Sequence, residues 1–344
     1  MVRGTNWVGD ALMSVPALRE LRRILPEAHI TLCTRSWARG IFADADFLDD
    51  ILIYDRAKSN LQTILKQAKT WRERRFDLAI LFQNAFEAAL LAKIGNAKWR
   101  VGYQTDGRNF LLSHPLPIPS WKNERHEIFY YLNIVAELET RLYGATKVWE
   151  REPDINLTVS EQRKSAAREM LKSCGADLAR KTIVFCPGST NSRAKRWGAV
   201  KYAELADLFE QNSNANVVLI GTPDETEVSN EVLRIAKSKP ILLTGKTSLT
   251  EVVALLSIAD LLITNDTGPA HIAPALGTRT IVIFGPTIPA TTRPFSDLAE
   301  IIRKPPACAP CMLRDCPIDH RCMTAISADE VLKIVESGKW KVES

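Results

Sequence analysis

The 344-residue sequence lacks any long apolar run. No stretch reaches the roughly 18 apolar residues that a membrane-spanning helix needs. The first residues do not read as a secretory signal peptide either, because Asn6, Gly9 and Asp10 interrupt the apolar region that such a peptide requires. We therefore expect a cytoplasmic protein without a transmembrane segment.

The chain also lacks a strong excess of charge. It has 45 basic and 40 acidic residues, and the resulting net charge of +5 is too small to indicate a nucleic-acid partner. Seven cysteines in a chain of this length do not suggest a secreted disulfide scaffold. A hydrophobic content of 46% is ordinary for a globular protein that buries a sizeable core, and the length favours two domains.

Short apolar runs alternate with stretches of helical periodicity, and no sequence repeat is visible. This alternation predicts an α/β protein with two doubly wound, mostly parallel sheets. We expect domains at residues 1–158 and 159–326, followed by a C-terminal helix and tail, 327–344, that packs back on the first domain. The predicted strands are 30–33, 51–54, 78–82, 182–186, 216–220, 241–243, 261–264 and 280–284. The predicted helices are 15–25, 61–75, 85–94, 126–139, 161–173, 199–211, 226–236, 249–258, 269–276 and 328–336, with loops at 103–123 and 143–158.

Residues 261–287 carry the strongest functional pattern. A predicted strand runs into Asp266-Thr267-Gly268, and a helix with Pro269 in its first turn follows. Free N–H groups and the positive end of the helix dipole favour an anion there, although an ordinary capped helix has the same pattern. His271 by itself is more often a buried structural histidine than a ligand.

A second strand, loop and helix occupy residues 182–206. The loop contains Ser189 and Thr190, whose hydroxyls can donate hydrogen bonds, and Lys195 and Arg196, which could neutralise a diphosphate. A solvated loop is the alternative. A weaker signal follows the next strand, where Asp224 or Glu225 could bind ribose hydroxyls or merely begin a helix.

The N-terminal loop ends at Asp10, where a helix begins. Asp10 is either a helix cap, which contributes about 1 kcal/mol, or a general base, and spacing does not separate the two. Near the other end, Cys308, Cys311, Cys316 and Cys322 could ligate zinc, with His320 as a spare ligand. Their spacing is irregular for a zinc motif, so we favour reduced structural thiols.

These stretches together resemble the ADP-heptose:lipopolysaccharide heptosyltransferases of glycosyltransferase family 9. The matching residues follow the family's order along nearly the whole chain. The Thr-Asn-Trp start and the cysteine-rich tail are most similar to the enzymes that add the second heptose of the inner core. The segments that carry the resemblance are Arg3–Ala11, Pro187-Gly188, Ala194–Trp197, Asn265–His271 and Phe284–Thr287.

The resemblance implies a GT-B fold, in which two Rossmann-like domains face a central cleft. It implies inverting transfer from ADP-heptose to heptosyl-Kdo2-lipid A in a Gram-negative bacterium, with no required cofactor. The acceptor would bind the first domain at the cytoplasmic face of the inner membrane, where the protein would be peripheral. The nucleotide sugar would bind the second domain.

The resemblance also assigns roles to residues. Asp10 would be the catalytic base, and Lys195 would contact the diphosphate. By the same resemblance Asp266, Thr267, Gly268 and His271 would hold the sugar and the phosphates. The chemistry of their loops, rather than the resemblance, adds Ser189, Thr190, Arg196 and Glu225 as expected donor contacts. Acceptor contacts are expected from Asn6, Trp7, Gly9, Arg19, Arg22 and Arg23, although the three arginines are equally compatible with a solvated helix face.

Three alternatives stay open at this point. A first or third heptosyltransferase would differ only in its acceptor, a nucleotide-sugar 2-epimerase would need no acceptor, and a non-catalytic ADP-sugar binding module would show no turnover. One further expectation concerns the short N-terminus. Only Met1 to Arg3 can form a strand before the Asp10 loop, so either this strand is a stub or the chain starts a few codons too late.

Overall fold

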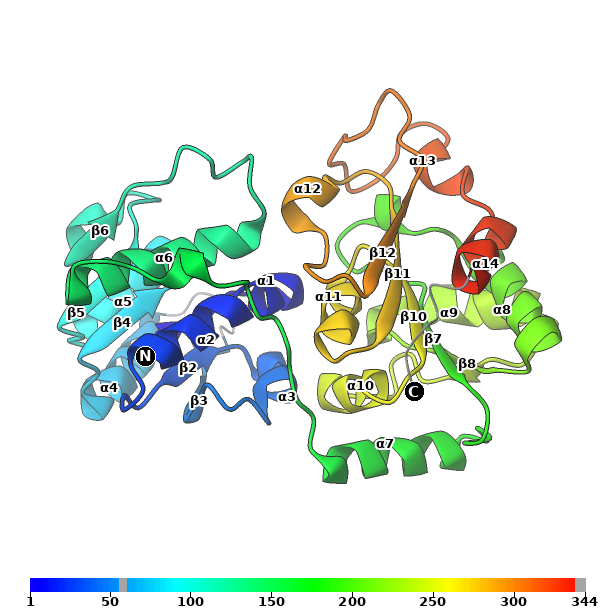
Figure 1. Cartoon of the computed structure of the whole chain (residues 1–344), viewed down its shortest axis with the longest axis horizontal. Coiled ribbons are helices and arrows are strands. Elements are labelled where there is room, and N and C mark those ends of the chain that lie inside the picture. Colours follow the sequence, from blue (N-terminus) through cyan, green and yellow to red (C-terminus); the bar gives the residue numbers. More distant parts are fainter. Residues whose placement is uncertain (56–60, 338–344) are drawn as a thin grey trace. The chain divides into compact units, whose positions relative to one another are not determined.

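A computed structural model describes residues 1–55 and 61–337 (Figure 1). The chain divides into two compact units. The first comprises Met1–Asn156 and Ala290–Thr292, and the second comprises Leu157–Pro289 and the chain from Arg293 onward. Each unit contains a six-stranded sheet whose registered pairs are all parallel.

The sheet of the first unit has the strand order β3-β2-β1-β4-β5-β6. Its strands are β1 (Val2–Arg3), β2 (Thr31–Thr34), β3 (Asp50–Ile53), β4 (Leu78–Leu81), β5 (Trp99–Tyr103) and β6 (His114–Leu116). Its helices are α1 (Val8–Met13), α2 (Val15–Ile24), α3 (Arg39–Phe42), α4 (Leu61–Arg74), α5 (Phe86–Ile94) and α6 (Glu127–Tyr143), with short turns η1 (Ser36–Ala38), η2 (Asn109–Leu111) and η3 (Val148–Glu150). The helices pack in two groups, α2 with α6 and α4 with α5.

The sheet of the second unit has the order β12-β11-β10-β7-β8-β9. Its strands are β7 (Thr182–Cys186), β8 (Asn216–Leu219), β9 (Ile241–Leu242), β10 (Leu261–Asn265), β11 (Arg279–Phe284) and β12 (Ala299–Arg303). Its helices are α7 (Glu161–Ser173), α8 (Ala199–Ser213), α9 (Thr226–Ile235), α10 (Leu249–Leu256), α11 (Gly268–Ala275), α13 (Arg321–Thr324) and α14 (Ala328–Glu336), with turns η4 (Arg193–Lys195) and η5 (Pro223–Glu225). The short helix α12 (Pro289–Thr292) falls mostly within the segment assigned to the first unit.

Both sheets therefore share one topology. The first three strands are added toward one edge of the sheet, and the fourth strand then pairs with the first and starts the other half. These two strands are β1 and β4 in the first unit and β7 and β10 in the second. Doubly wound sheets bind ligands beyond the carboxyl ends of the strands at this switch point. The loop that follows β1 leads to Asp10 in the first turn of α1, and the segments that follow β7 and β10 contain Lys195 and Asp266.

The first strand is short but central. β1 has two residues, and both lie between β2 and β4 in parallel register. Hydrogen bonds extend the pairing on both sides, from Gly4 N to Cys33 O at 2.9 Å and from Phe82 N to Arg3 O at 3.1 Å. The stub thus fixes where the loop to Asp10 begins.

The sequence missed three strands. β5 and β6 fall at and inside the segment expected to be a loop, and β12 lies between β11 and the tail. These strands are short or half-polar, and they form the outer part of their sheets. Their apolar pattern is weak because such strands are covered on fewer sides than central ones.

The C-terminal helix packs on the core of the second unit. α14 begins with a capping box of Ser327 and Glu330 and contacts α8 of the second unit. Its apolar residues Val331, Leu332 and Val335 belong to the core that also contains Trp197, several residues of α8 and residues of the sheet. The apolar face of α14 is thus buried within the second unit, and the expected packing of the tail on the first domain stays a prediction. Residues 338–344 lie outside the described part.

Candidate functional site

Asp10 lies in the first turn of α1 but does not cap it. The N-cap position belongs to Trp7, which has extended backbone angles and is 60% exposed. The Asp10 carboxylate is half-buried and forms no hydrogen bond within the described residues. The helix-cap interpretation therefore lacks the hydrogen bond that it requires.

The surroundings of Asp10 make its carboxylate a stronger base than an ordinary aspartate. Burial raises the pKa of Asp10 to about 6, the nearby Glu127 carboxylate adds to this shift, and Lys122 opposes it. Lys122 and Glu127 form an ion pair with each other at the start of α6. Tyr131, one turn further along α6, is buried close enough for Asp10 to raise its pKa. At pH 7 most of the Asp10 side chain is still ionised and can accept a proton.

A buried arginine holds the loop that leads to Asp10. Arg3 is 1% exposed and donates hydrogen bonds to Gly4 O at 2.9 Å and Cys33 O at 3.1 Å. Asn6 Oδ1 accepts from Arg3 at 3.5 Å and from Arg35 Nε at 3.1 Å. Both arginines also lie near the ring of Tyr54. Asn6 is thus part of the support for the loop.

The three arginines of α2 already have partners inside the first unit. Arg19 pairs with Asp46 and Asp154 and stacks over Phe47, Arg22 pairs with Asp49, and Arg23 pairs with Glu20 and Glu139. An anionic acceptor would have to compete with these carboxylates. Their acceptor role stays a prediction, and the structure gives each of them a structural role as well.

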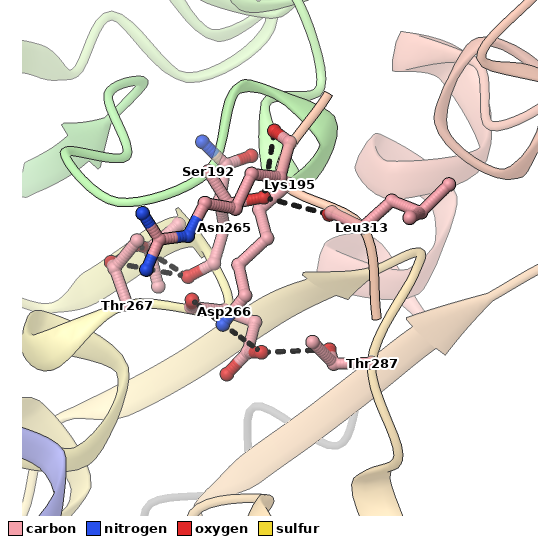
Figure 2. A network of polar contacts seen from close by, with 9 residues as sticks. Ser192, Lys195, Asn265, Asp266, Thr267, Thr287 and Leu313 are labelled. Atoms are coloured by element: carbon pink, nitrogen blue, oxygen red, sulfur yellow. Dashed lines mark hydrogen bonds and ion pairs between the residues drawn. The ribbon is translucent and has the colours of Figure 1, made fainter. Parts of the chain in front are cut away.

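In the second unit, Lys195 and Asp266 meet across the switch point of the sheet (Figure 2). Lys195 Nζ lies 2.7 Å from Asp266 Oδ2 and 3.2 Å from the Asp266 backbone oxygen. Thr287, after β11, donates to the same carboxylate oxygen at 2.7 Å. Asp266 is 6% exposed, so its charge is compensated by both partners. The pair holds a lysine ammonium at the carboxyl edge, where a ligand can reach it.

Asn265 joins the two loops that carry this pair. Its amide nitrogen donates to Pro187 O at 2.9 Å and Gly188 O at 3.0 Å, and its oxygen accepts from Trp197 N at 3.0 Å. Tyr202 also donates to that oxygen, at 3.2 Å. The amide is therefore fully used, and it fixes the loop after β7 to the end of β10.

The start of α11 matches the predicted anion site in form. Thr267 is the N-cap residue, Pro269 is in the first turn, and the Thr267 side chain forms no cap hydrogen bond. The Thr267 hydroxyl instead lies 3.1 Å from the Thr264 hydroxyl. His271 is 8% exposed, as expected for a histidine in the interior of this helix.

Glu225, rather than Asp224, faces the loop after β7. Asp224 is exposed, whereas Glu225 is 5% exposed. Glu225 accepts hydrogen bonds from Thr222 N at 2.8 Å and from the Thr190 hydroxyl at 3.3 Å. A Cβ atom on Gly188 would lie 2.3 Å from the Glu225 carboxyl carbon, so only glycine leaves room for this side chain. Nearby, Arg196 donates to Ser189 O at 3.2 Å, and Ser189 is buried.

The cysteine-containing loop supports the loop of Lys195. His320 Nε2 lies 2.6 Å from Ala194 O, and Ala194 N donates to Arg314 O at 2.9 Å. Ser192 contacts the carbonyl oxygens of Leu313 and Arg314. The four cysteines of this region are free thiols, and the pKa of Cys322 is raised by burial and by the nearby Cys316, Cys311 and Cys308. Within residues 1–55 and 61–337, no group of three or more His, Cys, Asp or Glu side chains is arranged to hold a metal ion.

Several contributors to these sites were not predicted. Lys122 and Glu127 are more than a hundred residues from Asp10, and nothing in the local sequence links them to it. Asn265 and Thr287 were visible as members of a motif, but their hydrogen-bond partners depend on the fold.

Among the described residues, no helix has the length and apolar character needed to cross a membrane.

Comparisons with known proteins agree on one family. The family model described as "Glycosyltransferase family 9 (heptosyltransferase)" matches residues 64–321. Lipopolysaccharide heptosyltransferase 2 of Salmonella typhimurium is 30% identical over 88% of this chain and 87% of its own length. Lipooligosaccharide heptosyltransferase 2 of Campylobacter jejuni is 26% identical, with 96% of each chain covered.

A solved structure of E. coli ADP-heptose lipopolysaccharide heptosyltransferase II matches 98% of this chain and 97% of its own, with a TM-score of 0.82 and 26% identity. The match confirms the expected GT-B class, an α/β protein with two Rossmann-like units. The family model covers most of the chain, including the loops of Lys195 and Asp266. The chain is therefore a glycosyltransferase and belongs to glycosyltransferase family 9, the heptosyltransferases.

Proposed function

We propose that the protein is an inverting transferase that moves L-glycero-D-manno-heptose from ADP-heptose to the first heptose of heptosyl-Kdo2-lipid A. Family membership supports heptosyl transfer, and the names of the relatives support the second heptose as the product. The observation that carries the proposal is the half-buried Asp10 carboxylate at the switch point of the first sheet, which forms no hydrogen bond with any residue that the structure describes. A binding module would have no need of such a base.

The two units divide the substrates in this proposal. The first unit binds the acceptor and supplies Asp10, and the second unit binds the nucleotide sugar and supplies Lys195. The partly exposed ammonium of Lys195 suits a diphosphate, while Asp266 keeps it in position. The buried carboxylate of Glu225, close to the Thr190 hydroxyl, is the better candidate for the ribose than the exposed Asp224.

Asp10 acts first on the acceptor in the proposed mechanism. Its carboxylate accepts the proton of the acceptor hydroxyl while that oxygen forms a bond to the anomeric carbon. The bond between the anomeric carbon and the phosphate oxygen breaks on the opposite side, and the configuration inverts. A pKa of about 6 lets Asp10 remain mostly ionised near neutral pH and still hold the proton better than an ordinary aspartate.

The electron pair of the broken bond leaves with ADP. Lys195 and the free N–H groups at Thr267 and Gly268 stabilise the growing negative charge on the diphosphate. These donors are held in place before the reaction by Asp266, Thr287 and Asn265, so little reorganisation is needed when charge develops. The mechanism uses only side chains and backbone groups of this chain.

The acceptor is a glycolipid, so the proposal includes peripheral association with the cytoplasmic face of the inner membrane. Asn6, Trp7 and Gly9 stay candidates for acceptor contacts because they belong to the loop of Asp10. The exposed Trp7 is the most accessible side chain of the three.

The proposal is tested by mass spectrometry of the products. The purified protein is incubated with ADP-heptose and, separately, with Kdo2-lipid A that carries no heptose or one heptose. We expect the gain of one heptose only on the monoheptosylated acceptor. Transfer only to the acceptor without heptose would instead identify a first heptosyltransferase, and conversion of ADP-heptose without an acceptor would indicate an epimerase.

A further inference from the structure

A cavity of about 260 Å³ in the first unit lies outside the site described above. Its volume is several times the ~30 Å³ of a water molecule and somewhat below the roughly 300–1,000 Å³ of pockets for drug-sized ligands. A single sugar residue fits this size, whereas a whole core oligosaccharide does not. The cavity is lined by Arg125, Phe129, Leu132, Val148, Trp149, Arg151, Glu152 and Pro153.

Arg125 is held in this cavity by aromatic rings rather than by a carboxylate. Its guanidinium carbon lies 4.0 Å from the ring centre of Phe129, 5.1 Å from that of Trp121 and 5.8 Å from that of Trp149. Contact with aromatic faces orders the guanidinium but leaves the N–H groups at its edge free to donate. Arg125 is exposed, so an incoming ligand can reach these donors.

Arg151 gives the cavity a second guanidinium. Among the described residues, the guanidinium groups of Arg125 and Arg151 form no ion pair and no side-chain hydrogen bond. This holds also for the neighbouring Glu152 carboxylate, which pairs with neither arginine. The arginines of α2 differ, because each of them is paired with at least one carboxylate. Two guanidinium groups that form no ion pair among the described residues, one of them held by aromatic rings, favour an anionic ligand.

The remaining lining suits a sugar. Trp149 is 43% exposed and presents a flat apolar surface on which the face of a pyranose ring can pack. Glu152 adds a carboxylate that can accept hydrogen bonds from sugar hydroxyls. A phosphate alone would make no use of the aromatic wall or of Glu152.

The cavity and Asp10 are linked through one helix of the same unit. Phe129 and Leu132 of α6 line the cavity, while Glu127 and Tyr131 of α6 lie near Asp10. The first two turns of α6 thus separate the two sites by a fixed, short distance. A sugar held in the cavity would leave the neighbouring sugar of the same chain close to the proposed base.

We propose that this cavity binds an acidic sugar of the acceptor, with its carboxylate on Arg125 and Arg151, its ring on Trp149 and its hydroxyls on Glu152. This assignment rests on the proposed function, because it concerns the acceptor of that reaction. The acidic sugar would then be a Kdo residue next to the heptose that receives the new bond.

The test measures acceptor binding separately from turnover. The deacylated, monoheptosylated Kdo acceptor is titrated calorimetrically into the full-length wild-type protein and into Arg125→Ala, Arg151→Ala and Trp149→Ala. We expect each arginine variant to bind this acceptor about tenfold or more weakly, as loss of a charge-assisted contact predicts. Arg141→Ala is the matched control, because Arg141 is an exposed arginine of α6 that does not line the cavity.

Two modified acceptors identify the anionic group. On an acceptor whose Kdo carboxyl groups are reduced to alcohols, wild type and the arginine variants should bind equally. On a dephosphorylated acceptor, the difference between them should persist. A difference that disappears only on dephosphorylation would overturn the sugar-acid assignment in favour of a phosphate site, and equal binding of the intact acceptor by all proteins would overturn the site altogether.

The outcome is distinguishable from failure of the proposed function. If wild type binds the acceptor through both arginines but transfers no heptose, the reaction is wrong and the cavity assignment stands. If wild type transfers heptose and the arginine variants bind the acceptor as wild type does, the reaction stands and the cavity assignment is wrong. Titration of ADP-heptose into the same variants, which should be unaffected, checks that they are folded.

Discussion

At the scale of single residues, the surroundings of Asp10 destabilise the ionised form of its carboxyl group. Its pKa of about 6 lies above the ordinary value of 3.8, first because of burial and then because of Glu127. Since one pKa unit corresponds to about 1.4 kcal/mol, the ionised carboxylate costs up to about 3 kcal/mol of folding free energy at neutral pH. No hydrogen bond offsets this cost within the described chain. A cost of this kind at the carboxyl edge of a doubly wound sheet is typical of a functional group.

This cost gives a stability prediction for Asp10→Asn. The neutral amide removes the charge, so the variant should be more stable than wild type at pH 7 to 8, by up to about 3 kcal/mol. The pKa of Asp10 is about 6 in the folded state and near its ordinary value of 3.8 in the unfolded state. As the pH falls from about 6 to below 3.8, the folded protein takes up the proton first, and wild type regains the lost stability. Thermal unfolding at pH 7.5 and pH 4 measures the difference. If Asp10 were a helix cap, the substitution would bring no such gain at pH 7.5.

The Lys122–Glu127 pair predicts opposite shifts in the pH dependence of transfer. Glu127 raises the pKa of Asp10 and Lys122 lowers it. Glu127→Gln should therefore move the acidic limb of the kcat/KM profile to lower pH, and Lys122→Met should move it to higher pH. The wild-type limb should lie near pH 6. Profiles that coincide for all three proteins would show that Asp10 is not the titrating group.

At the scale of elements, the proposed donor site depends on three loops that meet at one sheet edge. Asn265 and Asp266 after β10 bind the loop after β7, and Thr287 after β11 completes the contact with Asp266. The C-terminal cysteine-containing loop then supports the loop of Lys195 from its other side, through His320 and the backbone of Arg314. The tail is thus part of the support of the proposed donor site, even though it supplies no ligand contact in the proposed mechanism.

The support from the tail predicts an effect of His320→Asn on donor binding. Asparagine tolerates the left-handed backbone at this position, where φ is 57°, but its shorter side chain loses the hydrogen bond to Ala194 O. Loss of one such bond corresponds to roughly 1 kcal/mol, so ADP-heptose should bind about fivefold more weakly. Calorimetric titration measures this change. Arg321→Ala, which breaks only the local pair with Asp319, serves as control, and equal affinities of the two variants would refute the support role.

Much of this arrangement could be read from the sequence, because central strands and helices carry strong patterns. β7, α7 and α14 have the predicted bounds, and most other predicted elements differ by one to four residues at an end. Outer strands such as β6 were missed, since partial exposure weakens their pattern. The motif residues were found as such, but the choice of Glu225 over Asp224 depends on burial against Gly188. The influence of Lys122 and Glu127 on Asp10 is a tertiary effect that no local pattern records.

At the scale of the whole molecule, the two units repeat one topology and differ in their charge at the switch point. The first unit presents a carboxylate after its first strand, whereas the second presents a lysine paired with a buried aspartate. A carboxylate suits proton abstraction from a neutral hydroxyl, and an ammonium suits a diphosphate. This difference is the physical basis for assigning the acceptor to one unit and the donor to the other.

The division predicts that donor affinity responds to only one of two substitutions. Lys195→Ala removes the ammonium from the diphosphate and should weaken ADP-heptose binding by about tenfold or more. Asp10→Asn should leave the dissociation constant of ADP-heptose unchanged, because Asp10 belongs to the other unit. Titration of both variants measures this. A marked loss of donor affinity in Asp10→Asn would contradict the division.

The most direct test is the rate at which Asp10→Asn transfers heptose from ADP-heptose to the monoheptosylated acceptor at saturating concentrations of both. Removal of a general base predicts that kcat falls by about a hundredfold to ten-thousandfold. If this variant binds ADP-heptose as tightly as wild type and is at least as stable, the lower kcat reflects the loss of proton abstraction rather than misfolding or weaker donor binding. Transfer by Asp10→Asn at the wild-type rate would contradict the assignment of Asp10 as the base.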